Sequence, residues 1–154
     1  MSFLISALPV APFLPLFDLS DAQLAEHRAV RRIADKRPGF PCRISLRDVE
    51  PGVPVLLVHY EHLAVQSPYR ASHAIYVSRT DRAALAPDEV PAMLRSRLLS
   101  LRAFDRSGMM VDADVADGHA VEPVIERMLG NADADYIHVH LAKPGCYAAR
   151  VDRA

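Results

Sequence analysis

Alternating apolar and polar residues run through the middle and the end of the chain, a pattern typical of β-strands. The segment 53–60 differs, because it is apolar on both faces until it reaches His59, as in a central strand buried on both sides. In the segment 135–141 the aliphatic residues alternate with Tyr136, His138 and His140, so these three polar rings share one strand face. Further strands are predicted over residues 30–34, 71–77 and 146–151.

A β-hairpin is predicted around Gly108. The run Arg106-Ser107-Gly108 fits a three-residue loop whose last residue is left-handed, a conformation that glycine adopts without strain. With Asp105 opposite Met109, one face becomes apolar and the other polar, which favours this register. The predicted apolar pairs are Ala103 with Val111, Leu101 with Ala113 and Leu99 with Val115. The predicted polar pairs are Arg102 with Asp112 and Ser100 with Asp114. We expect Arg102 and these two aspartates to form a solvated cross-strand ion pair.

Three short helices are predicted. The first spans 21–27, because Ser20 and Gln23 form a capping-box pattern. A second begins at Asp88, with Pro91 in its first turn. The third spans 120–129 and carries its apolar residues at helical spacing before Gly130-Asn131 ends it. Because helices and strands do not alternate strictly, we predict one α+β domain over residues 1–154, with a mixed or mostly antiparallel sheet of about seven strands.

Composition and charge bear on which classes of partner the protein can bind. The 154 residues carry a net charge of -1 with no basic run, so nucleic acid is not expected as a partner. The apolar start, residues 1–17, has no basic leader and is interrupted by three prolines, and no apolar stretch is long enough to cross a bilayer. We therefore expect a cytoplasmic protein without a membrane partner, and the oligomeric state stays open.

The histidines are the first candidates for chemistry. His138 and His140 leave the same face of one predicted strand, so they can bind a divalent metal such as zinc. A third ligand could come from His59, His62, His73 or Cys146. The alternative interpretation is a polar outer strand face.

The two cysteines are further candidates. Cys146 follows a Pro-Gly turn, and its place beside the histidine strand makes it a candidate nucleophile. We expect its sulfur on the histidine face, because Cys146 and Arg150 alternate together and Arg150 would not face an aliphatic core. A buried structural thiol is the alternative for both Cys146 and Cys42, and whether the two lie close together stays open.

Several residues could orient a small anionic ligand. One turn delivers Tyr69 and Arg70 to the strand that carries His73, and Arg43 and Arg150 add two guanidinium groups. His73 also fits a buried, hydrogen-bonded core histidine, because it shares a face with apolar residues.

Four segments carry a family resemblance: Pro38 to Arg43, Tyr69 to Ile75, Leu98 to Val115, and Tyr136 to Arg153 with its Pro144-Gly145-Cys146-Tyr147 turn. Together they resemble an uncharacterised family of short bacterial proteins, domain of unknown function 1203. The resemblance implies a single domain in a bacterial, cytoplasmic setting. It implies no activity, cofactor or catalytic residue.

Three classes of function therefore remain. The first is a small enzyme or enzyme-like domain that binds a small anionic ligand, with catalytic candidates His73, His138, His140 and Cys146 and ligand-binding candidates Arg43, Tyr69, Arg70 and Arg150. The second is a non-catalytic module that binds a metabolite or peptide. The third is a structural or interface protein, which a large exposed apolar patch would favour.

Overall fold

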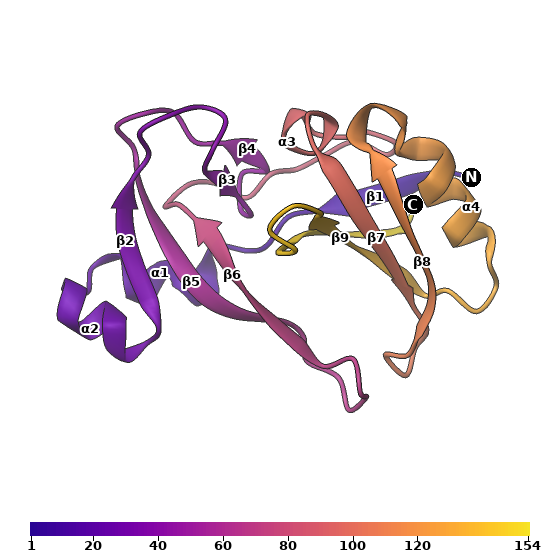
Figure 1. Cartoon of the computed structure of the whole chain (residues 1–154), viewed down its shortest axis with the longest axis horizontal. Coiled ribbons are helices and arrows are strands. Elements are labelled where there is room, and N and C mark those ends of the chain that lie inside the picture. The colour runs from indigo at the N-terminus through magenta and orange to yellow at the C-terminus, as the bar shows by residue number, and fades with distance from the viewer.

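The computed structural model describes residues 1–154 and places the strands in two five-stranded sheets (Figure 1). The β9 sheet is antiparallel throughout and has the order β1 (Phe3–Ser6), β10 (Tyr147–Arg153), β9 (Tyr136–Leu141), β7 (Leu98–Phe104) and β8 (Met110–Asp117). The β5 sheet has the order β2 (Ala29–Ile33), β5 (Pro54–Leu63), β6 (Ala71–Val77), β3 (Pro41–Cys42) and β4 (Arg47–Asp48), and only β3 and β6 pair in parallel.

The α+β class is confirmed, but the prediction of one sheet with about seven strands is wrong. A hydrophobic pattern marks a strand and its two faces, and it does not say which other strand it joins. β3 and β4 have two residues each, too few to show a period of two. β1 lies in the proline-rich start of the chain and pairs with the C-terminal strand β10, a partner that no local pattern reveals.

There are four α-helices where three were expected, and none is long and apolar enough to cross a membrane. Their bounds are α1 (Leu14–Phe17), α2 (Asp21–Glu26), α3 (Ala92–Arg95) and α4 (Glu122–Gly130), with two 3₁₀ turns, η1 (Ala11–Phe13) and η2 (Gly118–Ala120). The capping box of Ser20 and Gln23 is present at the start of α2. The second helix begins later than predicted, because Pro91 rather than Asp88 is its N-cap residue. Asp88 instead accepts hydrogen bonds from Ser2 and the Phe3 amide.

The hairpin turn is confirmed, but the predicted register is wrong by one residue. Gly108 has φ +81°, and the Asp105 amide donates to the Met109 carbonyl at 2.9 Å. An irregularity then leaves Val111 without a partner, as in a β-bulge, and this extra residue exchanges the faces of β8. The observed pairs are Ala103 with Asp112, Arg102 with Ala113, Leu101 with Asp114, Ser100 with Val115 and Leu99 with Ala116.

The shift moves two acidic residues to the other face of the sheet. Asp112 and Asp114 lie on the side of the sheet that α4 covers, and both form ion pairs with Arg127 of that helix, at 2.8 and 2.7 Å. The predicted pairing of Arg102 with Asp112 is therefore absent. Arg102 stays on its predicted face, where His138 of β9 lies beside it, and it hydrogen-bonds only Ser100.

Two hydrophobic clusters form the core. The larger one lies between the β9 sheet and α4 and includes Val121, Ile125 and Met128, as the helical spacing predicted. The second packs the β5 sheet against the N-terminal segments and includes Tyr147 from β10. The opposite face of the β9 sheet is turned toward the β5 sheet. The side chains on that face include imidazole and phenol rings, those of His138, His140 and Tyr147, which contact His62 of β5 or one another.

Candidate functional site

Four histidines from three strands gather between the two sheets; we call His62, His73, His138 and His140 the histidine cluster. His62 comes from β5 and His73 from the neighbouring strand β6. The centroid of the His62 ring lies 4.9 Å from those of His73 and His140 and 5.6 Å from that of His138. The two histidine groups of the sequence, far apart along the chain, therefore form one cluster. The fifth candidate, His59, is exposed on β5 and is not part of it.

Hydrogen bonds connect three of the rings. His73 Nδ1 lies 2.9 Å from His62 Nε2, and His62 Nδ1 lies 3.4 Å from His138 Nδ1. Each contact needs one proton, which either ring can supply. His62 is also stacked between His73 and Tyr147, with interplanar angles of 16° and 11°. Its orientation is thus restrained from both sides.

His140 is arranged differently. It is 0% exposed, and its Nδ1 lies 3.0 Å from the Gly145 carbonyl oxygen. A carbonyl only accepts, so Nδ1 carries the proton and donates it, and Nε2 is left with a free lone pair. Nε2 is the only buried side-chain nitrogen or oxygen in the chain without a hydrogen-bond partner.

Burial favours the neutral form of the clustered histidines. Burial, with smaller contributions from neighbouring rings and Arg102, lowers the pKa of His62 to about 4 and the pKa of His138 and of His140 to about 3. Burial also lowers the pKa of His73. Neutral imidazoles offer lone pairs for a metal or an acidic proton.

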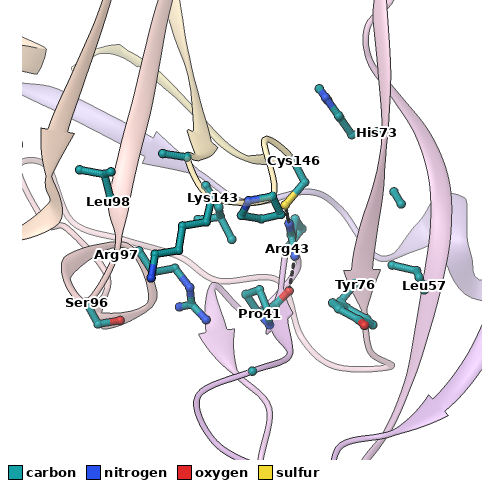
Figure 2. Close-up of a pocket in the computed structure, with 15 residues that line it drawn as sticks. Pro41, Arg43, Leu57, His73, Tyr76, Ser96, Arg97, Leu98, Lys143 and Cys146 are labelled. Carbon is teal, nitrogen blue, oxygen red and sulfur yellow. Dashed lines mark hydrogen bonds between the residues drawn. The ribbon is translucent and has the colours of Figure 1, made fainter.

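A pocket of about 710 Å³ lies beside the cluster, bordered by both sheets (Figure 2). His73 and Cys146 line it together with Arg43, Arg97 and Lys143, and no aspartate or glutamate does. Asp48 pairs with Arg97 at 2.6 Å and neutralises it, whereas Arg43 and Lys143 have no carboxylate partner. The ammonium of Lys143 and the hydroxyls of Tyr76 and Ser96 make no hydrogen bond within the chain. The pocket, which we call the Arg43 pocket, is therefore net positive and has free donors.

Arg43 is a buried cation that is only 1% exposed. It donates to the carbonyl oxygens of Tyr147 and Pro41, at 2.8 and 2.6 Å, and to Cys146 Sγ at 2.8 Å (Figure 2). Burial lowers the pKa of Arg43, and the nearby Cys146 opposes this effect. Among the three partners of Arg43, the sulfur is the only atom that can become an anion.

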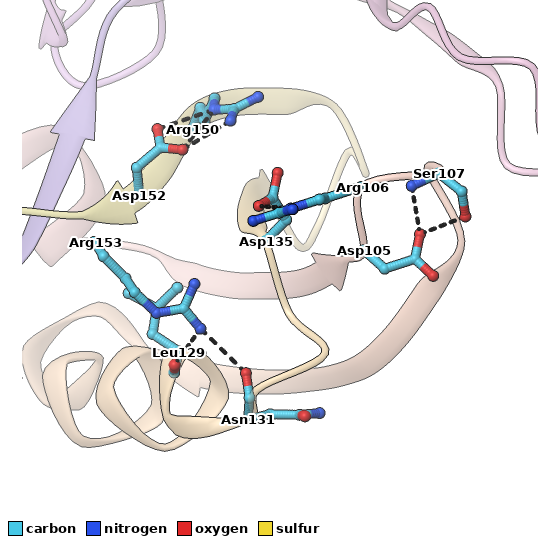
Figure 3. A network of polar contacts seen from close by, with 9 residues as sticks. All are labelled: Asp105, Arg106, Ser107, Leu129, Asn131, Asp135, Arg150, Asp152 and Arg153. Atoms are coloured by element: carbon cyan, nitrogen blue, oxygen red, sulfur yellow. Dashed lines mark hydrogen bonds and ion pairs between the residues drawn. The ribbon is translucent and has the colours of Figure 1, made fainter.

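Contrary to expectation, the Cys146 sulfur does not join Arg150 on the histidine face. The pairing of β10 with β9 is irregular between Tyr147 and Ala149, so the alternation is interrupted there, and Cys146 packs against the larger, aliphatic cluster. Arg150 lies opposite His138 and pairs with Asp152 at 2.7 Å (Figure 3). Its guanidinium also lies over the Tyr136 ring. Cys42 and Cys146 are both free thiols, and Cys42 is fully buried, where Ser78 donates to its sulfur at 3.1 Å.

Tyr69 and Arg70 lie outside the Arg43 pocket. Arg70 makes two hydrogen bonds to Glu61, at 2.9 and 3.0 Å, and the Tyr69 ring packs edge-on against Phe104. Of the eight candidate residues, Arg43, His73 and Cys146 line the pocket, and His138 and His140 join His73 in the cluster.

Sequence reasoning missed Lys143, Arg97, Tyr76 and Ser96 as pocket residues. No local pattern marks them, because they come from three segments that only the packing of the two sheets brings together. It also missed Arg102, because the sequence does not show that the face carrying this side chain turns toward a second sheet.

Comparison with known proteins gives one match. Residues 39–153 match the model of a family described as protein of unknown function, DUF1203. No curated protein and no solved structure matches the chain. The matched segment contains the whole histidine cluster, Arg43 and Cys146. This match covers about three quarters of the sequence, so the chain belongs to the DUF1203 family, the family that the four segments resembled.

Proposed function

We propose that the protein is a small enzyme that binds a small anionic molecule in the Arg43 pocket and uses Cys146 as a nucleophile. The observation that carries the proposal is a pocket with two cationic side chains that lack a carboxylate partner, Arg43 and Lys143, and with no acidic residue in its lining. Its volume of about 710 Å³ lies within the range of small-ligand sites.

The cations have different roles in this proposal. Lys143 is exposed and unpaired, so its ammonium can contact the ligand directly. Arg43 is almost fully buried and acts by its charge, which in a low-dielectric environment attracts an anion more strongly than a solvated charge does. Tyr76 and Ser96 supply hydroxyl donors that can orient the ligand.

The thiol supports catalysis rather than binding alone. Cysteine is a nucleophile in covalent catalysis, and a neighbouring hydrogen-bond donor can hold its sulfur in position. Cys146 Sγ lies 2.8 Å from Arg43 Nη2, and the same sulfur lines the pocket. His73 lines it too and can act as an acid or base. A bacterial cytoplasm, where thiols stay reduced, is the setting we propose.

A second candidate is a binding module without turnover. The sulfur and three nitrogens of Arg43 already have partners, so these groups also fit a rigid wall that only shapes the pocket. In that case ligand affinity would not depend on the thiol.

Thermal unfolding with inorganic phosphate or a small dicarboxylate tests the anion site. A ligand of the folded state raises the melting temperature. We expect this rise to be lost in Lys143→Ala. It should be kept in the control Arg106→Ala, which also removes one positive charge but lies outside the pocket, where the Arg106 side chain is 92% exposed. An equal response of both variants would contradict the proposal.

Alkylation with iodoacetamide tests the thiol. We expect Cys146, located by mass spectrometry, to react faster than a free cysteine and to be protected by the bound anion. Cys42 is the internal control, because it is 0% exposed and should not react. Anion binding without a fast Cys146 would support the binding module and contradict the enzyme.

A further inference from the structure

We propose that His62, His73 and His140 bind one divalent transition-metal ion, and that His138 positions His62 from the side away from His73. This site is separate from the Arg43 pocket and does not depend on the proposed function, although His73 borders both. One nitrogen from each of the three rings lies within 4.8 Å of the others.

The distances suit a metal after a small adjustment. Ligand nitrogens of a tetrahedral zinc lie roughly 3.3 Å apart, given Zn–N bonds of about 2.0 to 2.1 Å. His62 Nε2 and His73 Nδ1 are already 2.9 Å apart. Both rings are half-buried and stacked on each other, so a small shift within the stack would admit an ion, while His140 is held in place by its backbone hydrogen bond.

His140 is the observation that points to a ligand. Its Nδ1–H donates to the Gly145 carbonyl, an arrangement that metal-binding histidines commonly have because it fixes the ring and directs the other nitrogen toward the metal. That other nitrogen, Nε2, is buried and without a partner. Leaving a buried polar atom unsatisfied costs free energy, which a coordinated ion would offset.

The second hydrogen bond of His62 completes the arrangement. When Nε2 binds the ion, Nδ1 keeps a proton and can donate it to His138 Nδ1, 3.4 Å away. His138 is then a positioning residue that does not touch the metal. The sequence had suggested His138 and His140 as the ligand pair; the structure favours His140 with the two histidines of the β5 sheet.

The chemistry of the donors selects the ion. Three imidazoles without a carboxylate suit zinc, copper, nickel or iron, and not magnesium or calcium, which prefer oxygen ligands.

The neighbouring charges predict what completes the coordination. Arg102, Arg43 and Arg150 act on the cluster as positive charges, and Glu61 is the one acidic group that acts on it. Three neutral ligands leave the full double charge of the ion and one open position. An anion or a hydroxide therefore fits that position best.

Zinc and cobalt titrations of chelator-treated, full-length protein test the site. We expect one equivalent of zinc to bind and to raise the melting temperature, and cobalt to give the visible spectrum of a tetrahedral nitrogen site. His62→Phe, His73→Phe and His140→Gln should each weaken zinc binding at least about tenfold, and His138→Asn by roughly 10- to 100-fold, the usual effect of a positioning residue. The matched control is His59→Phe, because His59 is an exposed histidine on β5, the strand that also carries His62. This variant should bind zinc as the wild type does.

The outcomes separate this site from the Arg43 pocket. Loss of zinc binding in Cys146→Ser, or a cobalt–thiolate band, would move the metal to the thiol and overturn the proposal. Binding that survives His140→Gln would overturn it as well. If a histidine variant does not fold, the wild-type titration still decides, because absence of both the melting shift and the cobalt spectrum rejects the site. Lys143→Ala should keep zinc binding whether or not anions bind.

Discussion

The two faces of β9 are equally buried and chemically opposite. Ile137, Val139 and Leu141 are at most 3% exposed and pack toward α4, while His138 and His140, also at most 3% exposed, face the β5 sheet. The aliphatic side chains need only van der Waals contact, and the core supplies it on this face. The histidine face has a buried nitrogen without a partner, and a nearby guanidinium, Arg102, without a carboxylate.

This difference separates stability from function. Burying polar rings costs free energy unless each finds a partner, and an apolar side chain would fill the same space at no such cost. Under the proposed metal site, the four histidines between the sheets serve binding rather than stability. The variants below measure how far the two faces differ.

The largest effect is expected on the aliphatic face. Leu101→Ala, at a residue that is 0% exposed, should lower the free energy of unfolding by about 2 to 5 kcal/mol, because it leaves a cavity between the β9 sheet and α4. Urea denaturation measures the change. Val115→Ala on the edge strand, where the side chain is 57% exposed, is the control and should change the value by less than about 0.5 kcal/mol.

A smaller loss is expected at the turn that joins β7 to β8. Gly108→Ala should destabilise the protein by more than about 1 kcal/mol, because φ is +81° and the new Cβ would lie 2.5 Å from the Val65 side chain. Gly130→Ala is the matched control. Nothing lies within 4 Å of that Cβ and its φ is not positive, so denaturation should reveal no loss. Equal losses in the two variants would contradict a special cost at the left-handed turn residue.

His62→Phe tests the histidine face directly. Phenylalanine keeps the stacking between His73 and Tyr147 and removes two polar atoms, so the metal-free variant should stay within about 1.5 kcal/mol of wild type. Calorimetry of the chelator-treated proteins measures this. A loss as large as that of Leu101→Ala would make the histidines part of the structural core and remove the distinction between the faces.

The smallest effect is expected from Arg127→Ala. Arg127 pairs with Asp112 and Asp114, but all three side chains are partly solvated, and such ion pairs contribute little. We expect a melting temperature indistinguishable from that of wild type. A clear drop would show that the acidic residues brought to this side by the register are costly when unpaired.

Local patterns predicted much of the secondary structure and part of the site. The helical spacing before Gly130 located α4, and the alternation in 136–141 put His138 and His140 on one face, because both signals depend only on backbone period. The bulge at Val111 escaped prediction. It inserts one residue where the hydrophobic pattern favoured an unbroken ladder, and so moved Asp112 and Asp114 to the side of α4, away from Arg102.

The sequence by itself determined the α+β class, the capping box of α2, the Gly108 turn and the polar face of β9, since each follows from residues close in the chain. Only the tertiary structure decided that there are two sheets, that His62 and His73 meet His138 and His140, and that Arg43 lies on Cys146, 103 residues away. These are contacts between segments that belong to different sheets or to the loops beside them, and they depend on how faces pack in space, which no local periodicity encodes.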